Sequence, residues 1–171
     1  MTVIGKKLFV ICKSLPEIEV YDAHTLDHLS NIEVKGLTKP QDIVASREDH
    51  QLYVADKDGI WQVSAAEGYE YEKWLTTDSS TSGFYAITLS LTSGRLLVTL
   101  PRGLRQYSTT DKELLRAIDC PEYMQCMYNS VETTRDTFVI SHHGTSHDKD
   151  LYAVSLLFSM CDSSYRAYTM L

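Results

Sequence analysis

Leu52-Tyr53-Val54 is one of four short apolar stretches that recur along the chain at a nearly fixed distance. The period is 42 to 44 residues, and the four copies are Leu8-Phe9-Val10, Leu52-Tyr53-Val54, Leu96-Leu97-Val98 and Phe138-Val139-Ile140. A second apolar stretch begins 8 to 13 residues after the start of each copy, at 18–21, 60–63, 104–107 and 151–154. A period of this length, built from short strands, is typical of propeller blades. We therefore expect an all-β fold made of repeated blades.

The second repeat shows the unit most clearly. It predicts four antiparallel strands, at Gln41–Ser46, Gln51–Ala55, Ile60–Ser64 and Glu70–Thr76. Asp56-Lys57-Asp58-Gly59 is predicted to join the second and third strands as a tight turn, in which Gly59 supplies the backbone freedom that a hairpin needs. The fourth strand is the most polar of the set, so we expect it at the outside of the blade.

The same pattern divides the chain into blades of unequal completeness. We expect a first, partial blade at residues 7–36, a second at 37–77, a third at 83–119 and a fourth, partial blade at 122–155. The first is expected to lack its inner strand, because the pattern starts directly at Lys7–Cys12. Lys112–Ile118 is interpreted as the outer strand of the third blade, although its composition favours a helix. From residue 156 the pattern is lost, so 156–171 is expected to be an off-pattern C-terminal tail.

The prediction is therefore a partial β-propeller of about three to four four-stranded antiparallel blades in an incomplete ring, since closed rings need at least about four blades. An incomplete ring leaves strand edges and apolar blade faces uncovered, which is an aggregation hazard. Either the chain is a piece of a longer propeller, or something else covers those faces, such as self-association. The sequence leaves this choice open, together with the number of blades in the intact ring and the oligomeric state.

Composition and charge exclude several classes of partner. The chain has 171 residues, 43% of them hydrophobic, and a formal net charge of −7, so it is long and apolar enough for a folded core. The negative net charge argues against a dedicated nucleic-acid binder, because neutralising phosphates needs clustered lysines and arginines, and it equally disfavours docking on an anionic membrane surface. No apolar run approaches the roughly 20 residues that span a bilayer, and the N-terminus lacks the pattern of a signal peptide. We expect a cytoplasmic protein whose four cysteines are reduced.

Two stretches resemble a known family of propeller repeats. Gly36–Ala45, in which Pro40 opens the inner strand, is followed by Leu52-Tyr53-Val54-Ala55-Asp56 and then by Ile60-Trp61-Gln62-Val63, an order similar to an NHL repeat. Residues 8–26 resemble the related YVTN repeat, and the resemblance covers about residues 7–155. It implies a six-bladed or similar propeller that is used mostly for binding protein or RNA.

A minority of that family are enzymes, such as amidating lyases and lactonase-like propellers. The resemblance implies that these enzymes gather metal ligands at the central channel from several blades. The inner strands of this chain offer Asp42, Ala86 and Asn129, which are not a repeated series of ligands. The sequence therefore predicts no catalytic residues and no cofactor.

One loop of the fourth repeat carries the densest group of candidate metal ligands, His142, His143, His147 and Asp148. Imidazole and carboxylate groups bind zinc and other transition metals, so a loop metal site is one interpretation. Adjacent side chains of a strand point to opposite faces, however, so His142 and His143 would rarely share one ion. We favour a polar hairpin loop. Asp56–Gly59 is likewise interpreted as a capped turn, because the glutamate that closes a calcium loop is missing.

The third repeat concentrates positive charge in an acidic chain. The residues concerned are Arg95, Arg102, Arg105, Lys112 and Arg116, with Tyr85 and Tyr107 available for stacking. RNA contact is one interpretation of such a patch. The alternation of side chains along a strand distributes these cations over two faces, so RNA is the less favoured partner. Trp61 and Trp74 are interpreted as packing residues.

These observations favour a non-enzymatic β-propeller scaffold that binds a protein partner through its rim loops. The partner and the residues that bind it are unknown at this point. One alternative is a metal-assisted hydrolase or lyase of the enzymatic propeller type. Another is a truncated product without independent activity, suggested by the loss of the repeat after Ser155.

Overall fold

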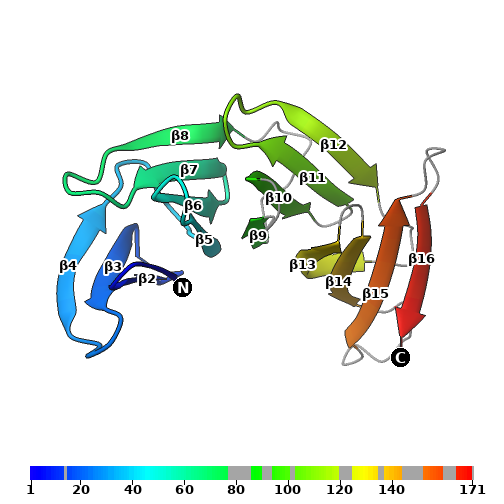
Figure 1. The fold of residues 1–171 in the computed structure, drawn as a ribbon, viewed down its shortest axis with the longest axis horizontal. Coiled ribbons are helices and arrows are strands. Elements are labelled where there is room, and N and C mark those ends of the chain that lie inside the picture. The colour runs from blue at the N-terminus through cyan, green and yellow to red at the C-terminus, as the bar shows by residue number, and fades with distance from the viewer. Residues whose placement is uncertain are drawn as a thin grey trace. The chain divides into compact units, whose positions relative to one another are not determined.

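The computed structural model describes residues 1–13, 15–76, 86–89, 94–100, 103–119, 125–134, 137–143, 152–159 and 165–170. These residues form sixteen β-strands in four antiparallel sheets of four strands each (Figure 1). The expected all-β fold of four-stranded blades is confirmed. Within the same residues, no helix is long and apolar enough to cross a membrane. The chain divides into two compact units, Met1–Ile87 and Thr88–Leu171, which are described separately.

Sheet A begins at the second residue of the chain. Its strands are β1 (Thr2–Ile4), β2 (Lys7–Ile11), β3 (Glu17–Asp22) and β4 (His28–Glu33), hydrogen-bonded in that order. The expectation that the first blade lacks its inner strand is wrong, because β1 pairs antiparallel with β2. The connecting turn contains Gly5 at a φ of 58°, a conformation that glycine adopts without steric cost. Three residues are too few to show an alternating pattern, so β1 carries no signal in the sequence.

Sheet B matches the four strands expected for the second repeat. It consists of β5 (Asp42–Ser46), β6 (Gln51–Asp56), β7 (Gly59–Ser64) and β8 (Tyr71–Thr76). The turn between β6 and β7 depends on Gly59, which has a φ of 148°. A Cβ at this position would overlap the carbonyl oxygen of Leu75 in β8, so only glycine fits here.

Sheets A and B pack face to face and form the core of the first unit. Their facing sides contribute one cluster of buried residues: Ile4, Phe9, Ile18, Val20 and Ile32 from sheet A, Ile43, Leu52, Val54, Trp61 and Val63 from sheet B, and Val34 and Leu37 from the connection. A polar contact reinforces this packing, because Lys7 Nζ donates to the hydroxyl of Tyr69 at 3.1 Å and lies 5.2 Å from the centre of its ring. Burying each large apolar side chain stabilises the unit by about 1.5–3 kcal/mol.

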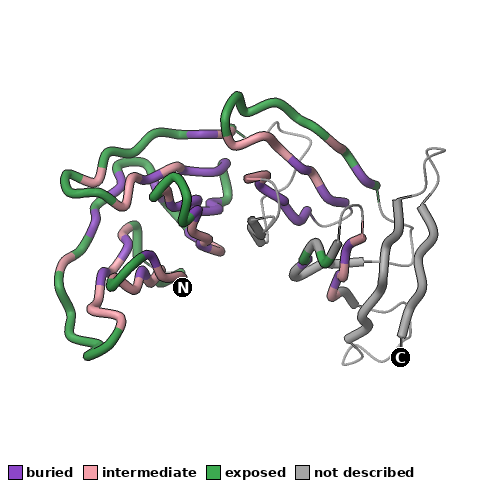
Figure 2. The backbone as a smooth tube through the Cα atoms, viewed as in Figure 1, coloured by how far each residue is buried: buried purple, intermediate pink, exposed green. Residues whose placement is uncertain are grey.

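The other face of sheet B is also buried along β6, around Tyr53 and Ala55. Tyr53 and Ala55 alternate with Leu52 and Val54 along β6, and they are 1% and 0% exposed. Tyr53 packs edge-on against Trp74, with 5.3 Å between the ring centres, so the interpretation of the tryptophans as packing residues is confirmed. Figure 2 shows the result: β6 is buried along most of its length, whereas the outer strand β4 is mainly exposed.

Sheets C and D complete the described strands. Sheet C comprises β9 (Ala86–Leu89), β10 (Arg95–Leu100), β11 (Gly103–Ser108) and β12 (Leu114–Asp119). Sheet D comprises β13 (Gln125–Thr134), β14 (Thr137–His143), β15 (Tyr152–Ser159) and β16 (Tyr165–Met170). β12 confirms the strand expected at 112–118. In the second unit the hydroxyls of Thr99 in β10 and Ser130 in β13 form a buried hydrogen bond of 2.7 Å.

Sheet D differs from the expected end of the repeat. β15 passes the boundary at residue 155, and β16 lies entirely within the segment expected to be an off-pattern tail. β16 pairs antiparallel with β15, from Val154 opposite Met170 to Ser159 opposite Tyr165. The sequence before β16 has no glycine turn of the kind that marks the other hairpins, so the pattern gave no sign of a fourth strand.

The turn before the outer strand repeats in three sheets. Leu26, Tyr69 and Lys112 have φ values of 63°, 44° and 63°, and they lie 43 residues apart. In the turns of Leu26 and Lys112 a side chain accepts two backbone N–H groups: Asp22 accepts from His24 and Thr25, and Ser108 from Thr110 and Asp111. The same N–H groups hold the pKa of Asp22 below its ordinary value. Left-handed backbone costs a non-glycine residue roughly 1–2 kcal/mol, so these turns are strained at one position each.

Replacing Leu26 by glycine is expected to stabilise the protein. Glycine removes the left-handed strain, and Leu26 is 63% exposed, so little packing is lost. We expect the free energy of unfolding to rise by about 0.5–1 kcal/mol, measured by urea denaturation. Leu29→Gly is the matched control: Leu29 is 52% exposed but lies within β4, so glycine there is expected to destabilise. A loss of stability in Leu26→Gly would contradict the assignment of strain to this turn.

The buried phenol of Tyr53 is expected to make the protein sensitive to alkali. Burial, together with the smaller effect of the nearby Asp49 carboxylate, raises the pKa of Tyr53 to about 12. Unfolded tyrosine ionises near about pH 10, so the stability contributed by the neutral buried phenol is complete below that pH and is lost as pH rises toward about 12. Urea denaturation of the wild type and Tyr53→Phe at neutral and alkaline pH measures this. We expect similar stabilities at neutral pH and a steeper alkaline loss in the wild type; parallel losses would contradict the prediction.

Candidate functional site

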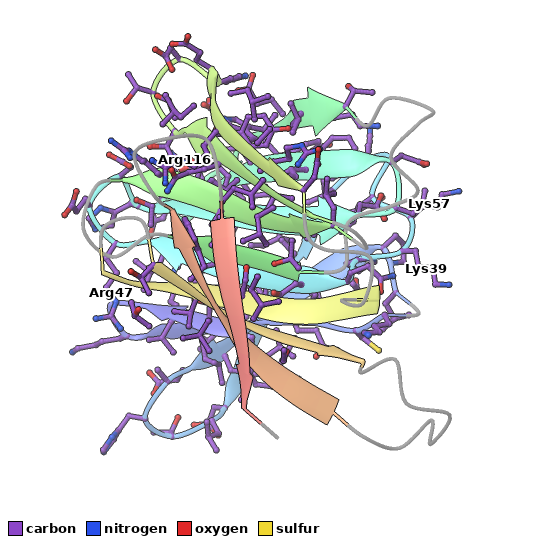
Figure 3. The ribbon with its side chains drawn as sticks, turned by 90° about the vertical axis from the view of Figure 1, so that its right-hand side faces the viewer. Lys39, Arg47, Lys57 and Arg116 are labelled. Atoms are coloured by element: carbon purple, nitrogen blue, oxygen red, sulfur yellow. The ribbon has the colours of Figure 1, made fainter. Side chains whose placement is uncertain are left out.

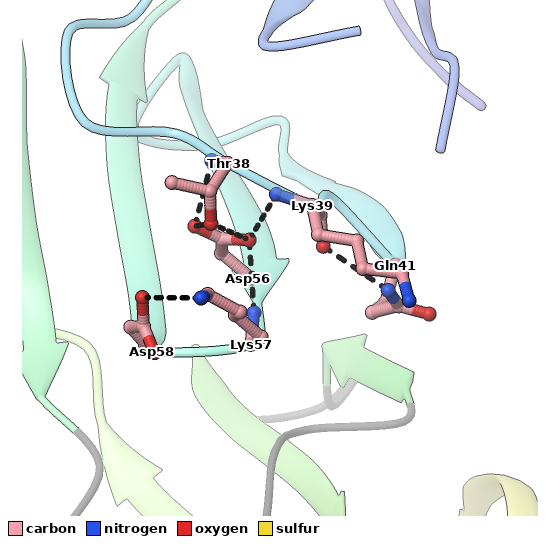
Figure 4. A network of polar contacts seen from close by, with 6 residues as sticks. All are labelled: Thr38, Lys39, Gln41, Asp56, Lys57 and Asp58. Atoms are coloured by element: carbon pink, nitrogen blue, oxygen red, sulfur yellow. Dashed lines mark hydrogen bonds and ion pairs between the residues drawn. The ribbon is translucent and has the colours of Figure 1, made fainter. Parts of the chain in front are cut away.

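Asp56, the last residue of β6, holds the loop that leads into sheet B. The residue is fully buried, and its carboxylate accepts the backbone N–H groups of Thr38 at 3.0 Å and Lys39 at 2.7 Å (Figure 4). It also accepts the Thr38 hydroxyl at 3.1 Å and the N–H of Lys57 at 2.8 Å. Hydrogen bonds to an ionised acceptor are stronger than neutral ones, so this network fixes the connection between β4 and β5 to the end of β6.

Apolar contacts anchor the same connection. Val34 and Leu37 are 1% and 3% exposed and belong to the core of the first unit. Gly36, with a φ of 98°, lies against the indole of Trp61, and a Cβ there would come within 2.9 Å of the ring. The side chains between these anchors are exposed: Lys35, Thr38 and Lys39 face solvent. The loop is therefore rigidly held while its polar side chains stay accessible.

The antiparallel order of sheets A and B brings three connections to one end of the first unit. We call residues 12–13, 15–16, 34–41 and 57–58 the Asp56 rim. It carries four exposed lysines, Lys13, Lys35, Lys39 and Lys57, against the single exposed carboxylate of Asp58. Lys57 Nζ lies 3.7 Å from that carboxylate, and both side chains are more than half exposed. Figure 3 shows Lys39 and Lys57 at one end of sheet B and Arg47 at the other.

The opposite end of the first unit has the reverse charge. We call residues 5–6, 23–27, 47–50 and 65–70 the acidic rim; its exposed acidic residues are Asp27, Glu48, Asp49, Glu67 and Glu70, and its cations are Lys6 and Arg47. A groove of about 340 Å³ lies beside this rim on sheet B, lined by Gln51, Gln62, Ser64, Glu70, Tyr71 and Glu72. The first unit thus presents a basic surface and an acidic surface at opposite ends.

The sequence interpretation of Asp56–Gly59 as a capped turn is only part of the observed arrangement. The bond from the Lys57 N–H to Asp56 fits it, but most donors to this carboxylate come from residues 38–39, which the sequence analysis did not connect with Asp56. The available signal was an acidic residue ending an apolar strand that is buried on both faces. A carboxylate in that position requires several hydrogen-bond donors, and the nearest chain is the loop before β5.

The candidate metal ligands fall mostly outside this site. His142 and His143 end β14, opposite Ala153 and Tyr152 of β15, whereas His147 and Asp148 lie outside the described residues. In the portions of the chain that the structure describes, no group of three or more His, Cys, Asp or Glu side chains is placed to hold a metal ion. A metal site in the 142–148 loop stays a prediction.

The basic residues of the third repeat do not form one patch. Arg105 is engaged within its own sheet: it pairs with Asp119 at 2.9 Å and donates to the carbonyl oxygens of Leu104 and Ile118. Arg116 lies opposite Gln106, the neighbour of Arg105 in β11, so the two arginines lie on opposite faces of sheet C. Arg102 and Tyr85 lie outside the described residues.

Comparison with known proteins gives no family by sequence. No family model matches the chain, and no curated protein matches it.

Solved structures nevertheless resemble it closely in fold. The WD40 repeats of RRP9 match with a TM-score of 0.72 and 11% identity, over 95% of this chain and 47% of that one. The β-propeller domain of Cps50 (Swd1) from Myceliophteria thermophila matches with a TM-score of 0.69 and 11% identity, over 99% and 56%. Hydrazine synthase from Kuenenia stuttgartiensis matches with 0.71 and 16%, over 98% and 48%. The chain thus spans about half the length of these structures.

The four sheets are therefore blades of the β-propeller class. Each has four antiparallel strands in chain order, and the described strands pair only within their own sheets, so no strand of sheet D joins sheet A. At 11–16% identity these likenesses establish the fold and nothing finer.

Asp56→Ala is expected to destabilise the first unit strongly. The change leaves three backbone N–H groups and a hydroxyl without their acceptor at the end of β6, which we expect to lower the free energy of unfolding by about 3 kcal/mol. Asp58→Ala is the matched control, two residues away; its exposed ion pair contributes at most about 0.5 kcal/mol. Chemical denaturation of both variants measures the difference. Equal losses in the two variants would show that the network does not hold the loop.

Proposed function

We propose that the protein is a non-enzymatic scaffold that binds a polypeptide partner at the Asp56 rim. The observation that carries this proposal is the set of four exposed lysines on connections that the buried Asp56 and the core of the first unit hold in place. A binding loop that is already ordered loses little conformational entropy when a partner docks, so more of its contact energy appears as affinity.

Charge points to an acidic segment of that partner. The first unit contains 14 of the 23 acidic residues and 8 of the 16 basic ones, so lysines gathered at one end stand out against a negative surface. The lysines attract an acidic peptide that approaches the rim end-on, and this attraction speeds its association. A nucleic acid, with its continuous line of phosphates, also meets the carboxylates around the rim, which is why we favour protein over RNA.

The NHL/YVTN resemblance is compatible with this role. The segment that resembles the NHL repeat, Gly36 to Val63, contains the Asp56 network and half of the rim lysines. The solved structures of similar fold include WD40 repeats, another group of propeller blades. We place the chain among propellers of the NHL/YVTN type as part of the proposal.

A labelled acidic peptide, poly-glutamate, tests the charge preference directly. We expect fluorescence anisotropy to show salt-dependent binding that is weakened at least about tenfold in the double variant Lys39→Glu/Lys57→Glu. The matched control is Lys6→Glu/Arg47→Glu, which makes the same change of charge on the acidic rim and should bind as the wild type does. Equal weakening in both variants would mean that net charge, and not the Asp56 rim, governs binding.

Affinity capture with the same three proteins identifies the natural partner. Protein that is recovered by the wild type and the control, is lost with Lys39→Glu/Lys57→Glu and resists ribonuclease treatment supports the proposal. RNA recovered in its place, or capture that is indifferent to the rim lysines, would overturn it.

A further inference from the structure

The outward face of sheet A carries apolar side chains on β1, β2 and β3 that are only partly covered, beside three glutamates. Because Phe9, Ile18 and Val20 face sheet B, the residues that alternate with them lie on the opposite side. These residues are Val3, Leu8, Val10, Glu19 and Tyr21, all half-buried in the structure. On the corresponding side of sheet B, Tyr53 and Ala55 in β6 are 1% and 0% exposed. Sheet A therefore has partly exposed apolar side chains on a face whose counterpart in sheet B is buried along β6.

Sheet D presents a second such face. Phe138 and Ile140 in β14 are fully buried, so Val139 between them lies on the other side of the sheet. Val139 is half-buried and pairs with Val131 of β13, which is 40% exposed. Thr137 lies on the same side as Val139, two residues before it. The side chains described on this side, Val131, Thr137 and Val139, are apolar or carry a hydroxyl group.

The face of sheet A suits the face of sheet D better than it suits a second copy of itself. Glu17, Glu19 and Glu33 share the outward side of sheet A, as the pairing of Glu17 with Glu33 shows. Two copies of this face brought together would place like charges opposite one another, which opposes association. The hydroxyl of Thr137 on the sheet D face can donate to a carboxylate, and the valines of both faces supply the apolar contact.

We propose that the protein forms a homodimer in which sheet A of each copy packs on sheet D of the other. The chain covers 47–56% of the three solved structures named above, so two copies together would match about the length of one of them. The proposal concerns the blade faces and not the Asp56 rim, so it stands or falls independently of the proposed function.

The area available is sufficient for a stable dimer. A four-stranded blade with strands about 4.8 Å apart and about five residues long presents a face of roughly 300 Å². Two contacts between sheets A and D bury four such faces, about 1,200 Å² in total, which reaches the lower limit of specific interfaces. A single contact would bury only about half of that, so the closed dimer with both contacts is the stable form.

Light scattering behind gel filtration measures the mass of the full chain. We expect about 39 kDa, twice the chain mass of 19.4 kDa, over a wide range of concentration. A mass of 19.4 kDa throughout, or a distribution of larger species, would overturn the proposal.

Charge placed on either face is expected to split the dimer. Val10→Glu on sheet A and Val131→Glu on sheet D each put a carboxylate into both contacts, and we expect each to weaken dimerisation at least about tenfold. The matched control is Leu26→Glu, which adds the same charge to a leucine that is 63% exposed in the turn between β3 and β4. It should remain a dimer. Circular dichroism and melting curves show whether each variant is folded.

Mixing the two face variants separates this arrangement from a simple loss of folding. In a mixed dimer of Val10→Glu chains and chains that carry Val131→Lys in place of the glutamate, one contact carries two opposite charges and the other carries neither change. The mixture should therefore regain dimer that neither variant forms alone. Failure to regain it, or a dimer that resists both changes, would rule out packing of sheet A on sheet D.

Discussion

Face-to-face burial of sheets A and B is the interaction on which the first unit depends. Strand pairing satisfies the backbone of each sheet, but a single small sheet has too little apolar contact to be stable on its own. Phe9, Val20 and Leu52 therefore obtain their burial from the opposite sheet, at 0% exposure each. The Asp56 network depends on the same packing, because Val34 and Leu37 hold the loop that brings its donors to the carboxylate.

Much of the fold could be predicted from the sequence because propeller strands alternate strongly. Leu52, Val54 and their equivalents recur with a period close to that of the left-handed turn residues, and this recurrence located most strands. β1 and β16 were missed for different reasons. β1 has three residues, fewer than an alternating pattern needs, and β16 follows a segment without turn glycine. Strands at the two ends of a repeat array lack a neighbouring repeat on one side, so their pattern is the weakest.

The candidate site was harder to predict than the fold. A search of the sequence for functional residues favours side chains that lie close together along the chain, such as His142, His143 and His147. The Asp56 rim instead unites lysines from positions 13 to 57 with one buried carboxylate, and no local spacing links them. Only the antiparallel order of two sheets places these residues at one end of the unit. The single local sign was Asp56 itself, a charged residue that ends a strand buried on both faces.

The left-handed residues at 26, 69 and 112 give the chain a regular joining point. A gene segment that begins just after one such position and ends at the next encodes one complete set of four strands in a fixed register, taken from two sheets that follow each other in the sequence. Duplication or deletion of a 43-residue segment between these positions would therefore keep the turn before each outer strand in the same register and change only the number of blades. The strained backbone at one turn residue in each blade thus marks where such a protein can lengthen or shorten by whole blades.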